Sequence, residues 1–193
     1  MHFVPLQQLM NLGPEKCADN PLKDALASFS CQKDRYIENF AKERILEFEK
    51  ISKSRTYLFI DAEALKNKEI QIIAFFSLAM QILELPENLS VRQIKKLDGF
   101  SGKSHGEKIK FLPVFLIGQL AKNDCFSDRI TGDYILDRAI ATTGKASKIV
   151  GGRIITVDVK CGESKLIDFY ERNGFTVVNN DSEAGFTQMI YML

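Results

Sequence analysis

The residues 127–133, SDRITGD, lie between an apolar run and an amphipathic segment, where a buried strand would lead directly into a helix. The first turn of a helix presents N–H groups without intrahelical partners and the positive end of the helix dipole, which together favour an anion such as pyrophosphate. Arg129 could pair with a phosphate, Thr131 could donate its hydroxyl hydrogen, and Gly132 would let the backbone approach a ligand closely. The same composition also suits an ordinary capped helix, so both interpretations stay open at this point.

Other reactive side chains are scattered along the chain. His105 lies in the stretch SGKSHGEK, which lacks the spacing of a phosphate-binding P-loop, and we expect it to be an exposed side chain. Cys125 precedes the turn and is expected to be a free thiol, although a thiol there could also be acylated. Glu84, Glu87 and Asp98 could each deprotonate an amine, and their spacing does not choose among them. Two His and four Cys, with no C-x-x-C pair, disfavour a structural zinc site.

The composition is that of an ordinary globular chain, with 193 residues, 45% hydrophobic and 26% charged. A net charge of +1 provides no global field for nucleic acid or an anionic membrane, which leaves only a local basic patch for such partners. No signal peptide is expected, and the longest apolar run, 72–80, is too short for a membrane helix. The scattered cysteines, Cys17 among them, predict free thiols in a reducing cytoplasm.

The elements that must position the turn follow from the spacing of apolar residues. An amphipathic helix is expected over 33–50, followed by strands over 56–60, 70–83 and 112–122, the second of them buried on both faces. Residues 1–30 are expected to be irregular, 61–69 to be a polar turn, and 84–110 to be a long polar loop of the kind that is usually functional or mobile.

Beyond the turn, the pattern predicts a helix over 131–148, a strand over 153–159 and a helix over 165–173. Ser164 is the expected N-cap of the last helix and Gly174 the residue just past its end. Residues 175–178 and 187–193 would form a closing hairpin. The fold class is therefore mixed α/β, a single domain over 1–193 whose central sheet carries helices on its faces.

The second half of the chain, about 112–193, resembles the GNAT N-acetyltransferase superfamily. The resemblance rests on LIGQLAKNDCFSDRITGDYILDRAI, on RIITVDVK and above all on LIDFYERNGF. It implies a GNAT fold with a twisted, mainly antiparallel mixed sheet, whose splayed fourth and fifth strands hold the pantetheine arm of acetyl-CoA. Leu120, Ala121 and Lys122 occupy the strand positions whose backbone would bind that arm.

The same resemblance assigns to Tyr170 the role of the general acid that protonates the departing thiolate of CoA. A phenol has an ordinary pKa of about 10, so it is protonated at neutral pH and able to donate. In the alternative interpretation Tyr170 only packs on the sheet, as Phe169 and Phe175 would.

The family's turn Q/R-x-x-G-x-G/A aligns without a gap, and this chain departs from it at two positions. Ser127 replaces Q/R and Ile130 replaces the first Gly, whereas Gly132 matches the second and Arg129 matches a basic residue often found between them. An Asn often found before the tyrosine is replaced by Glu163. Two acids within the stretch add negative charge beside the expected pyrophosphate. Backbone N–H groups can still hold phosphate there, so the predicted cofactor-binding residues include the whole turn: Ser127, Asp128, Arg129, Ile130, Thr131, Gly132 and Asp133.

The N-terminal half carries a weaker resemblance to the GNAT toxins of bacterial toxin–antitoxin pairs, in Phe29–Ser30–Cys31 and in FFSL at 75–78. Asp34 or Glu38 loosely replaces a Leu-Asp pair of those proteins. They acetylate the α-amine of the amino acid on charged tRNA, so the resemblance implies tRNA as acceptor and an antitoxin as partner. Such toxins usually show a clear basic surface; here the basic residues of 50–55 and 92–110 also suit solvated faces.

The expected function is thus an N-acetyltransferase that moves acetyl from acetyl-CoA to a primary amine of an unidentified acceptor. The neutral amine would attack the thioester, and a backbone N–H near Leu120 would stabilise the oxyanion. Two alternatives remain: a degenerate acyl-CoA-binding protein with a regulatory role, favoured by the altered turn, and a partner-binding domain that uses the 84–110 loop. A homodimer is a candidate assembly, and no membrane partner is expected.

Overall fold

The structure, a computed structural model, describes residues 1–10, 20–67, 69–181 and 185–193; the expectations for Cys17 and the rest of 11–19 lie outside this range. The chain divides into two compact units, which are described separately. Unit 1 comprises Met1–Ala79 and Gly118–Ala139, and unit 2 comprises Met80–Ile117 and Ile140–Leu193.

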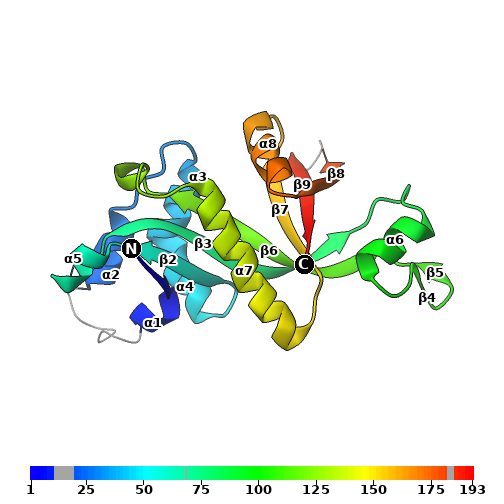
Figure 1. Cartoon of the computed structure of the whole chain (residues 1–193), viewed down its shortest axis with the longest axis horizontal. Coiled ribbons are helices and arrows are strands. Elements are labelled where there is room, and N and C mark those ends of the chain that lie inside the picture. Colours follow the sequence, from blue (N-terminus) through cyan, green and yellow to red (C-terminus); the bar gives the residue numbers. More distant parts are fainter. Residues whose placement is uncertain (11–19, 68, 182–184) are drawn as a thin grey trace. The chain divides into compact units, whose positions relative to one another are not determined.

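The described residues contain one large sheet and a separate small hairpin (Figure 1). The strands of the large sheet are β1 (His2–Pro5), β2 (Arg55–Ile60), β3 (Ile72–Glu84), β6 (Phe111–Lys122), β7 (Ile154–Lys160), β8 (Thr176–Asp181) and β9 (Phe186–Met192). They are hydrogen-bonded in the order β1-β2-β3-β6-β7-β9-β8. The pairs β1–β2, β2–β3, β7–β9 and β8–β9 are antiparallel and β6–β7 is parallel, which confirms the mixed, mainly antiparallel sheet.

Helices lie between the strands along the chain. They are α1 (Leu6–Met10), α2 (Pro21–Ala27), α3 (Arg35–Asn39), the π-helix η1 (Phe40–Arg44), α4 (Ile45–Lys50), α5 (Ala62–Lys66), α6 (Val91–Asp98), the 3₁₀-helix η2 (Asp124–Phe126), α7 (Gly132–Val150) and α8 (Ser164–Arg172). No helix in the described parts of the chain is long and apolar enough to cross a membrane.

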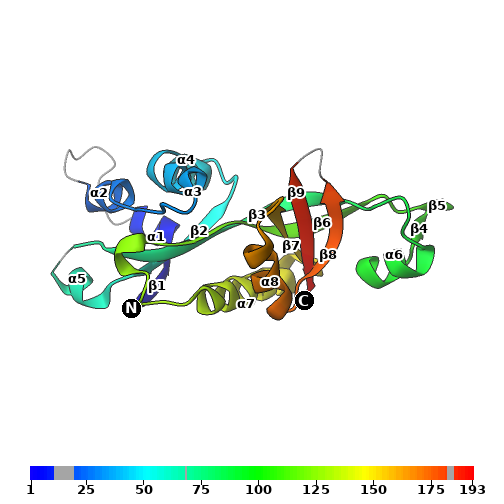
Figure 2. The ribbon, with the colours of Figure 1, turned by 90° about the horizontal axis from the view of Figure 1, so that it is seen from above.

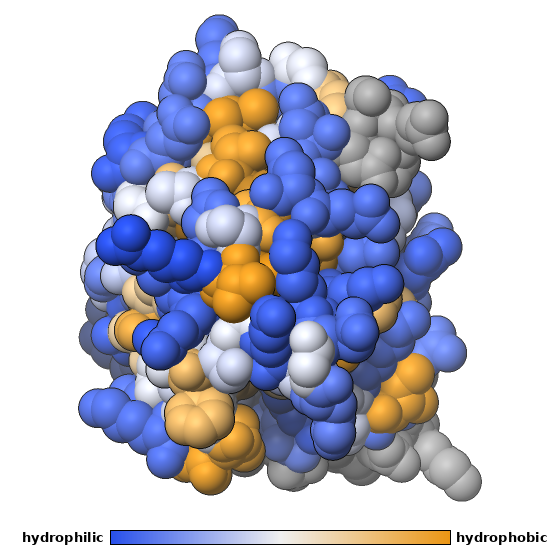
Figure 3. Space-filling view, turned by 90° about the vertical axis from the view of Figure 1, so that its right-hand side faces the viewer, coloured by the Kyte–Doolittle hydropathy of each residue, from blue (hydrophilic) through white to orange (hydrophobic). Residues whose placement is uncertain are grey.

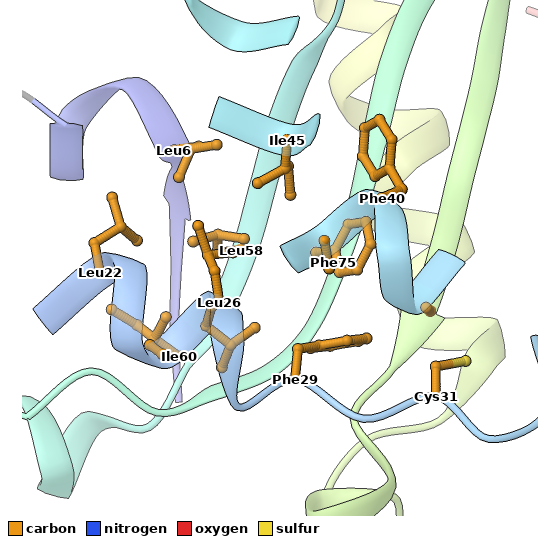
Figure 4. Packing of buried hydrophobic residues seen from close by; sticks show 14 residues of the cluster. Leu6, Leu22, Leu26, Phe29, Cys31, Phe40, Ile45, Leu58, Ile60 and Phe75 are labelled. Atoms are coloured by element: carbon orange, nitrogen blue, oxygen red, sulfur yellow. The ribbon is translucent and has the colours of Figure 1, made fainter. Parts of the chain in front are cut away.

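The core of unit 1 lies on one face of β2 and β3. Leu58, Ile60 and Phe75 all lie on this face because side chains alternate along a strand. Figure 4 shows them packed against side chains from the helices that cover this face. The helical members of this buried cluster are Leu6, Leu22, Ala25, Leu26, Phe40, Ala41 and Ile45. This apolar packing therefore holds α1, α2, η1 and α4 on the sheet.

The opposite face of the same strands carries a row of aromatic rings. Tyr57 stacks on Phe3 of β1 at 5.6 Å and on Phe76 of β3 at 5.2 Å between ring centroids. Phe59 meets Tyr134 of α7 at 6.0 Å. Aromatic pairs at such separations add to the stabilisation from burial. This contact places the first turn of α7, the end that follows the SDRITGD turn, against the sheet of unit 1.

Unit 2 contains three antiparallel strands in the order β7-β9-β8, so β9 lies between β7 and β8. Its register pairs Ile154 with Met192 and Lys160 with Phe186, and β8 completes the hairpin expected at the C-terminus. Within this unit β6 pairs with β7 at two positions, Phe115 with Ile155 and Leu116 with Thr156. Beyond this pair β6 continues to Lys122. Figure 2 shows β7, β8 and β9 as neighbours, with α8 beside them.

The strands expected at 56–60, 112–122 and 153–159 are confirmed to within a residue or two, but four expectations about the first half are wrong. The described part of 1–30 is not irregular, because it contains β1, α1 and α2. The helix over 33–50 is interrupted by η1, in which the N–H of Ile45 bonds the carbonyl of Phe40. Burial of β3 on both faces holds only for Ile72–Ser77, after which exposed and half-buried positions predominate. The polar turn over 61–69 contains α5.

The connection over 84–110 is also more ordered than the expected loop. Ser90 and Gln93 form a reciprocal capping box at the start of α6, and Gly99 ends the helix at φ +89°. The two-stranded hairpin β4 (Lys103–Ser104) and β5 (Glu107–Lys108) follows, turning through His105 and Gly106 at positive φ. Polar composition concealed α6 because its only buried side chain is Ile94.

The C-terminal helix begins one residue earlier than expected. Glu163 occupies the N-cap position of α8 and makes no side-chain cap bond, so Ser164 is the first helical residue and not the cap. Gly174 follows the helix at φ +86°, a conformation that other residues rarely adopt, which confirms its expected place.

Hydrophobic side chains also reach the surface of unit 2. On the side that bears α6 and the β4–β5 hairpin, they form a band between polar side chains (Figure 3). The large exposed apolar residues of this unit include Phe100, which is 87% exposed, together with Phe111 and Ile82.

Candidate functional site

The turn is attached to the end of β6 by Asn123, a side chain only 3% exposed. Its Nδ2 donates to the carbonyl of Ile72 at 2.9 Å, and its Oδ1 accepts the N–H groups of Cys125 at 3.2 Å and Ser30 at 3.4 Å. The backbone N–H of Asn123 also donates to the carbonyl of Ile73. One buried amide therefore links β6, the start of β3 and the segment that precedes α3.

The next residue, Asp124, joins the turn to the same N-terminal segment. Its Oδ2 accepts the hydroxyl of Ser30 at 3.1 Å and the N–H of Gln32 at 2.7 Å, and its own N–H donates to the carbonyl of Ser30. The motif Phe29–Ser30–Cys31 thus lies directly beside the turn. Phe29 is fully buried and meets the ring of Phe75 edge-on at 5.1 Å, which fixes this segment to the core.

The two acids expected near this motif have distinct partners. Asp34 caps α3, with Oδ1 accepting the N–H of Tyr36 at 2.9 Å. Glu38 accepts the N–H of Cys31 at 2.9 Å through Oε2 and pairs with Lys42 through Oε1. These bonds lower the pKa of Glu38, with the Lys42 bond as the largest cause. Burial raises the pKa of the Cys31 thiol, so this cysteine is held in its neutral form.

The turn itself does not use the backbone freedom of glycine. Among the described residues other than glycine, only Ser52 and His105 have a positive φ, so Ser127 and Ile130 adopt dihedral angles open to any side chain. Ile130 is 5% exposed and anchors the turn in the core. The Nζ of Lys122 donates to the carbonyl of Ser127 at 2.8 Å and closes the turn from the strand side. The burial of Ile130 and the Lys122 bond therefore hold the turn in place, without the first glycine of the family pattern.

The outer side of the turn is open to solvent. Ser127, Asp128, Arg129, Thr131 and Asp133 are all exposed, whereas Gly132, the first residue of α7, is half-buried. The Oγ1 of Thr131 accepts the N–H of Tyr134 at 3.2 Å and so caps the helix. The N–H groups at the very start of α7 have no intrahelical acceptor, and they lie at the positive end of a long helix.

The side chain of Arg129 makes an ion pair within unit 1. Its Nη1 bonds Oδ2 of Asp61, the residue that follows β2. Asp61 also caps α5, because its Oδ1 accepts the N–H groups of Glu63 at 2.7 Å and Ala64 at 3.2 Å. The Arg129 bond, followed by these two backbone bonds, lowers the pKa of Asp61 to about 2. Phe126 lies beneath the guanidinium, 5.9 Å from its ring centroid.

Tyr170 belongs to unit 2, whereas the residues from Leu120 to Asp133 all belong to unit 1. Its ring lies between Phe169 at 5.1 Å and Phe175 at 5.2 Å, both in edge-on geometry. Burial raises the pKa of the Tyr170 hydroxyl far above its ordinary value, so the phenol remains protonated at neutral pH. The packing interpretation and the acid interpretation are both compatible with this environment.

The remaining candidates show ordinary surroundings. His105 is exposed in the turn of the β4–β5 hairpin, and its Nδ1 lies 3.1 Å from the hydroxyl of Ser104. Asp98 accepts two backbone N–H groups, those of Phe100 and Ser101, at the end of α6. Cys125 is an exposed free thiol. Over the described ranges, no group of three or more His, Cys, Asp and Glu side chains could hold a metal ion.

Comparison with known proteins shows which fold these residues build. No family model matches the chain. No curated protein matches it either. Among solved structures, a tyrosine-to-phenylalanine mutant of KacT has a TM-score of 0.68 and 15% identity, covering 100% of this chain and 95% of that one.

The toxin AtaT gives similar results in two complexes. AtaT with acetyl-methionyl-tRNA has a TM-score of 0.65 and 17% identity, covering 86% of each chain. A tyrosine-to-phenylalanine AtaT mutant, bound to the C-terminus of the antitoxin AtaR and acetyl-CoA, has a TM-score of 0.63 and 16% identity over 88% of each chain. The chain has the fold of the GNAT toxins. At these identities the comparison establishes the fold, and the chemistry must be argued from this chain's own residues.

Proposed function

We propose that the chain is an N-acetyltransferase that moves acetyl from acetyl-CoA to a primary amine, and that the amine is that of an aminoacyl-tRNA. The observation that carries the proposal is the strand–turn–helix from Leu120 to Asp133, with its solvent-open turn, in the fold of toxins solved with acetyl-CoA. The tRNA acceptor is supported by the AtaT complex with acetyl-methionyl-tRNA. An antitoxin is the corresponding protein partner.

The residues of the turn fit an anionic group. The start of α7 offers backbone N–H donors, Thr131 offers a hydroxyl, and Arg129 offers a guanidinium whose side chain is 40% exposed. Asp128 and Asp133 oppose an anion by their charge, but both are exposed and screened by solvent. We therefore assign the pyrophosphate of CoA to this turn and the pantetheine arm to the backbone of Leu120, Ala121 and Lys122.

Two residues would act on the reacting atoms. When bound, acetyl-CoA supplies an activated acetyl thioester. The N–H of Leu120, or of a neighbour on β6, would donate to the thioester oxygen as negative charge develops there, and such a donor is worth about 3 kcal/mol. The Tyr170 hydroxyl is protonated at neutral pH, as any phenol is, and it would give that proton to the leaving thiolate.

A second function is favoured by one feature of the turn. Asp128 and Asp133 stand where a phosphate-binding turn has no need of acids, and Ser127 and Ile130 replace the family's residues. These departures suit a protein that binds acyl-CoA weakly and regulates a partner without catalysis. Turnover separates the two functions, because only the enzyme requires Tyr170.

Calorimetric titration with acetyl-CoA, followed by an acetylation assay on aminoacyl-tRNA and small amines, tests the proposal. Tyr170→Phe should retain acetyl-CoA affinity but lose turnover about 10²- to 10⁴-fold, the usual contribution of a general acid. Tyr191→Phe is the matched control, because its ring belongs to the same aromatic cluster, 5.3 Å from Phe175. Absence of binding by the unaltered chain at millimolar acetyl-CoA would refute both functions. Binding without turnover on any amine would leave the regulatory one.

A further inference from the structure

The ion pair between Arg129 and Asp61 joins two parts of unit 1 that the sequence separates by 68 positions. Asp61 lies at the end of β2, and Arg129 lies at the exposed apex of the turn. The Asp61 side chain is 9% exposed, so it lies beneath the surface and is not itself placed to meet a ligand. Arg129 remains 40% exposed on the same pair. The buried partner therefore fixes an exposed cation.

The two carboxylate oxygens of Asp61 have separate roles. Oδ1 accepts two backbone N–H groups at the start of α5, which orients the carboxylate, and Oδ2 receives Nη1 of Arg129. An arginine presents five N–H donors in a rigid plane, so a bond at Nη1 leaves donors on its other edges for a second anion. The ring of Phe126 supports the guanidinium from one face at 5.9 Å.

We propose that Asp61 is a positioning residue, which holds the guanidinium of Arg129 ready for the pyrophosphate of CoA. The inference rests on the proposed function. An unrestrained arginine side chain loses rotational freedom when it binds an anion, whereas one already held by a carboxylate loses less. The same contact also ties the turn to the end of β2, and so supports a turn in which Ile130 replaces the first glycine of the family pattern. The hairpin between β2 and β3 thereby becomes part of the cofactor site.

Two substitutions at one position separate this role from the capping of α5. Asp61→Asn keeps an oxygen for the helix cap and loses the charge, because Asn and Asp are similarly good N-caps. Asp61→Glu keeps the charge and impairs the cap. If the charge positions Arg129, Asp61→Asn weakens CoA binding about 3- to 10-fold and Asp61→Glu restores most of the affinity. If only the cap matters, the order is reversed and the inference is overturned.

Calorimetry with CoA on the full chain completes the test. It is repeated for Arg129→Ala and for the double variant that combines Asp61→Asn with Arg129→Ala. Loss of a charge-assisted bond predicts that Arg129→Ala weakens binding about 10- to 100-fold. The double variant should bind no worse than Arg129→Ala, because Asp61 acts only through the arginine. Asp34→Asn, a second helix-capping aspartate, is the matched control and should leave affinity unchanged.

The outcomes separate this inference from the proposed function. Additive losses in the double variant, or an unchanged affinity in Asp61→Asn, would overturn the positioning role while CoA binding by the unaltered chain stands. No CoA binding by the unaltered chain would overturn both. A parallel titration with inorganic pyrophosphate should show the same ranking of variants, because the positioned group meets that part of the cofactor.

Discussion

Replacing Asn123 by Ala should destabilise the chain strongly, although it removes only a short polar side chain. The change deletes the Nδ2 bond to the carbonyl of Ile72 and the two bonds that Oδ1 accepts from Cys125 and Ser30. A neutral hydrogen bond contributes about 1 kcal/mol, and a buried carbonyl left without its donor costs about 1–3 kcal/mol more. Because the Ser30 contact is long at 3.4 Å, we count it as weak and expect a total loss of about 2–4 kcal/mol.

Urea denaturation followed by circular dichroism measures this loss as a change in the free energy of unfolding. Asn67→Ala is the matched control, because Asn67 is exposed at the end of α5 and its truncation should change stability by less than about 0.5 kcal/mol. A loss below about 1 kcal/mol for Asn123→Ala would refute the view that this side chain links the turn to β3 and to the Phe29–Cys31 segment.

Two further predictions concern charge and backbone. Asp61 has a pKa of about 2, lower than its ordinary value, so the ion pair stabilises the fold above that ordinary value and is lost as pH falls from about 4 to about 2. The stability difference between the unaltered chain and Asp61→Asn should therefore be constant above about pH 5 and shrink below about pH 4 in urea titrations; a difference as large at about pH 2.5 as at about pH 6 would contradict the pairing. Gly174→Ala should cost at least about 1 kcal/mol, because φ is +86° and the new Cβ would lie 3.3 Å from Tyr191. Gly162→Ala shares the strain at φ +89° but has open space around it, so an equal loss in both thermal melts would exclude the Tyr191 contact as a cause.

The central part of the fold was predictable because its pattern is local. An apolar run followed by an amphipathic segment identified β6, the turn and α7 with nearly correct bounds, and the FYERNGF ending located α8 and Gly174. The missed elements lack such a pattern. β1 is a four-residue strand that exists through its pairing with β2, and α6 buries only Ile94. The π-helix between α3 and α4 leaves the apolar spacing of an ordinary helix almost unchanged.

The candidate site was predictable in its outline and not in its supports. Arg129 and Thr131 were recognised from their residue types at a helix start. The residues that hold the turn were not, because their partners are distant: Asn123 meets Ser30 across 93 positions, and Asp61 meets Arg129 across 68. Asp61 in sequence is one more acid in a polar turn. Only the pairing of β2 with β3 and the position of the turn in unit 1 bring it to the arginine.

The burial of Ile130 has a consequence for how this chain can evolve. A relative with glycine at this position could accept isoleucine gradually, as surrounding side chains made room for it. The reverse step is now obstructed, because removing a buried isoleucine costs about 2–5 kcal/mol and glycine adds about 1 kcal/mol of lost chain entropy. That sum approaches the whole stability of many domains. Glycine at position 130 would therefore be tolerated only after compensating changes elsewhere in the core.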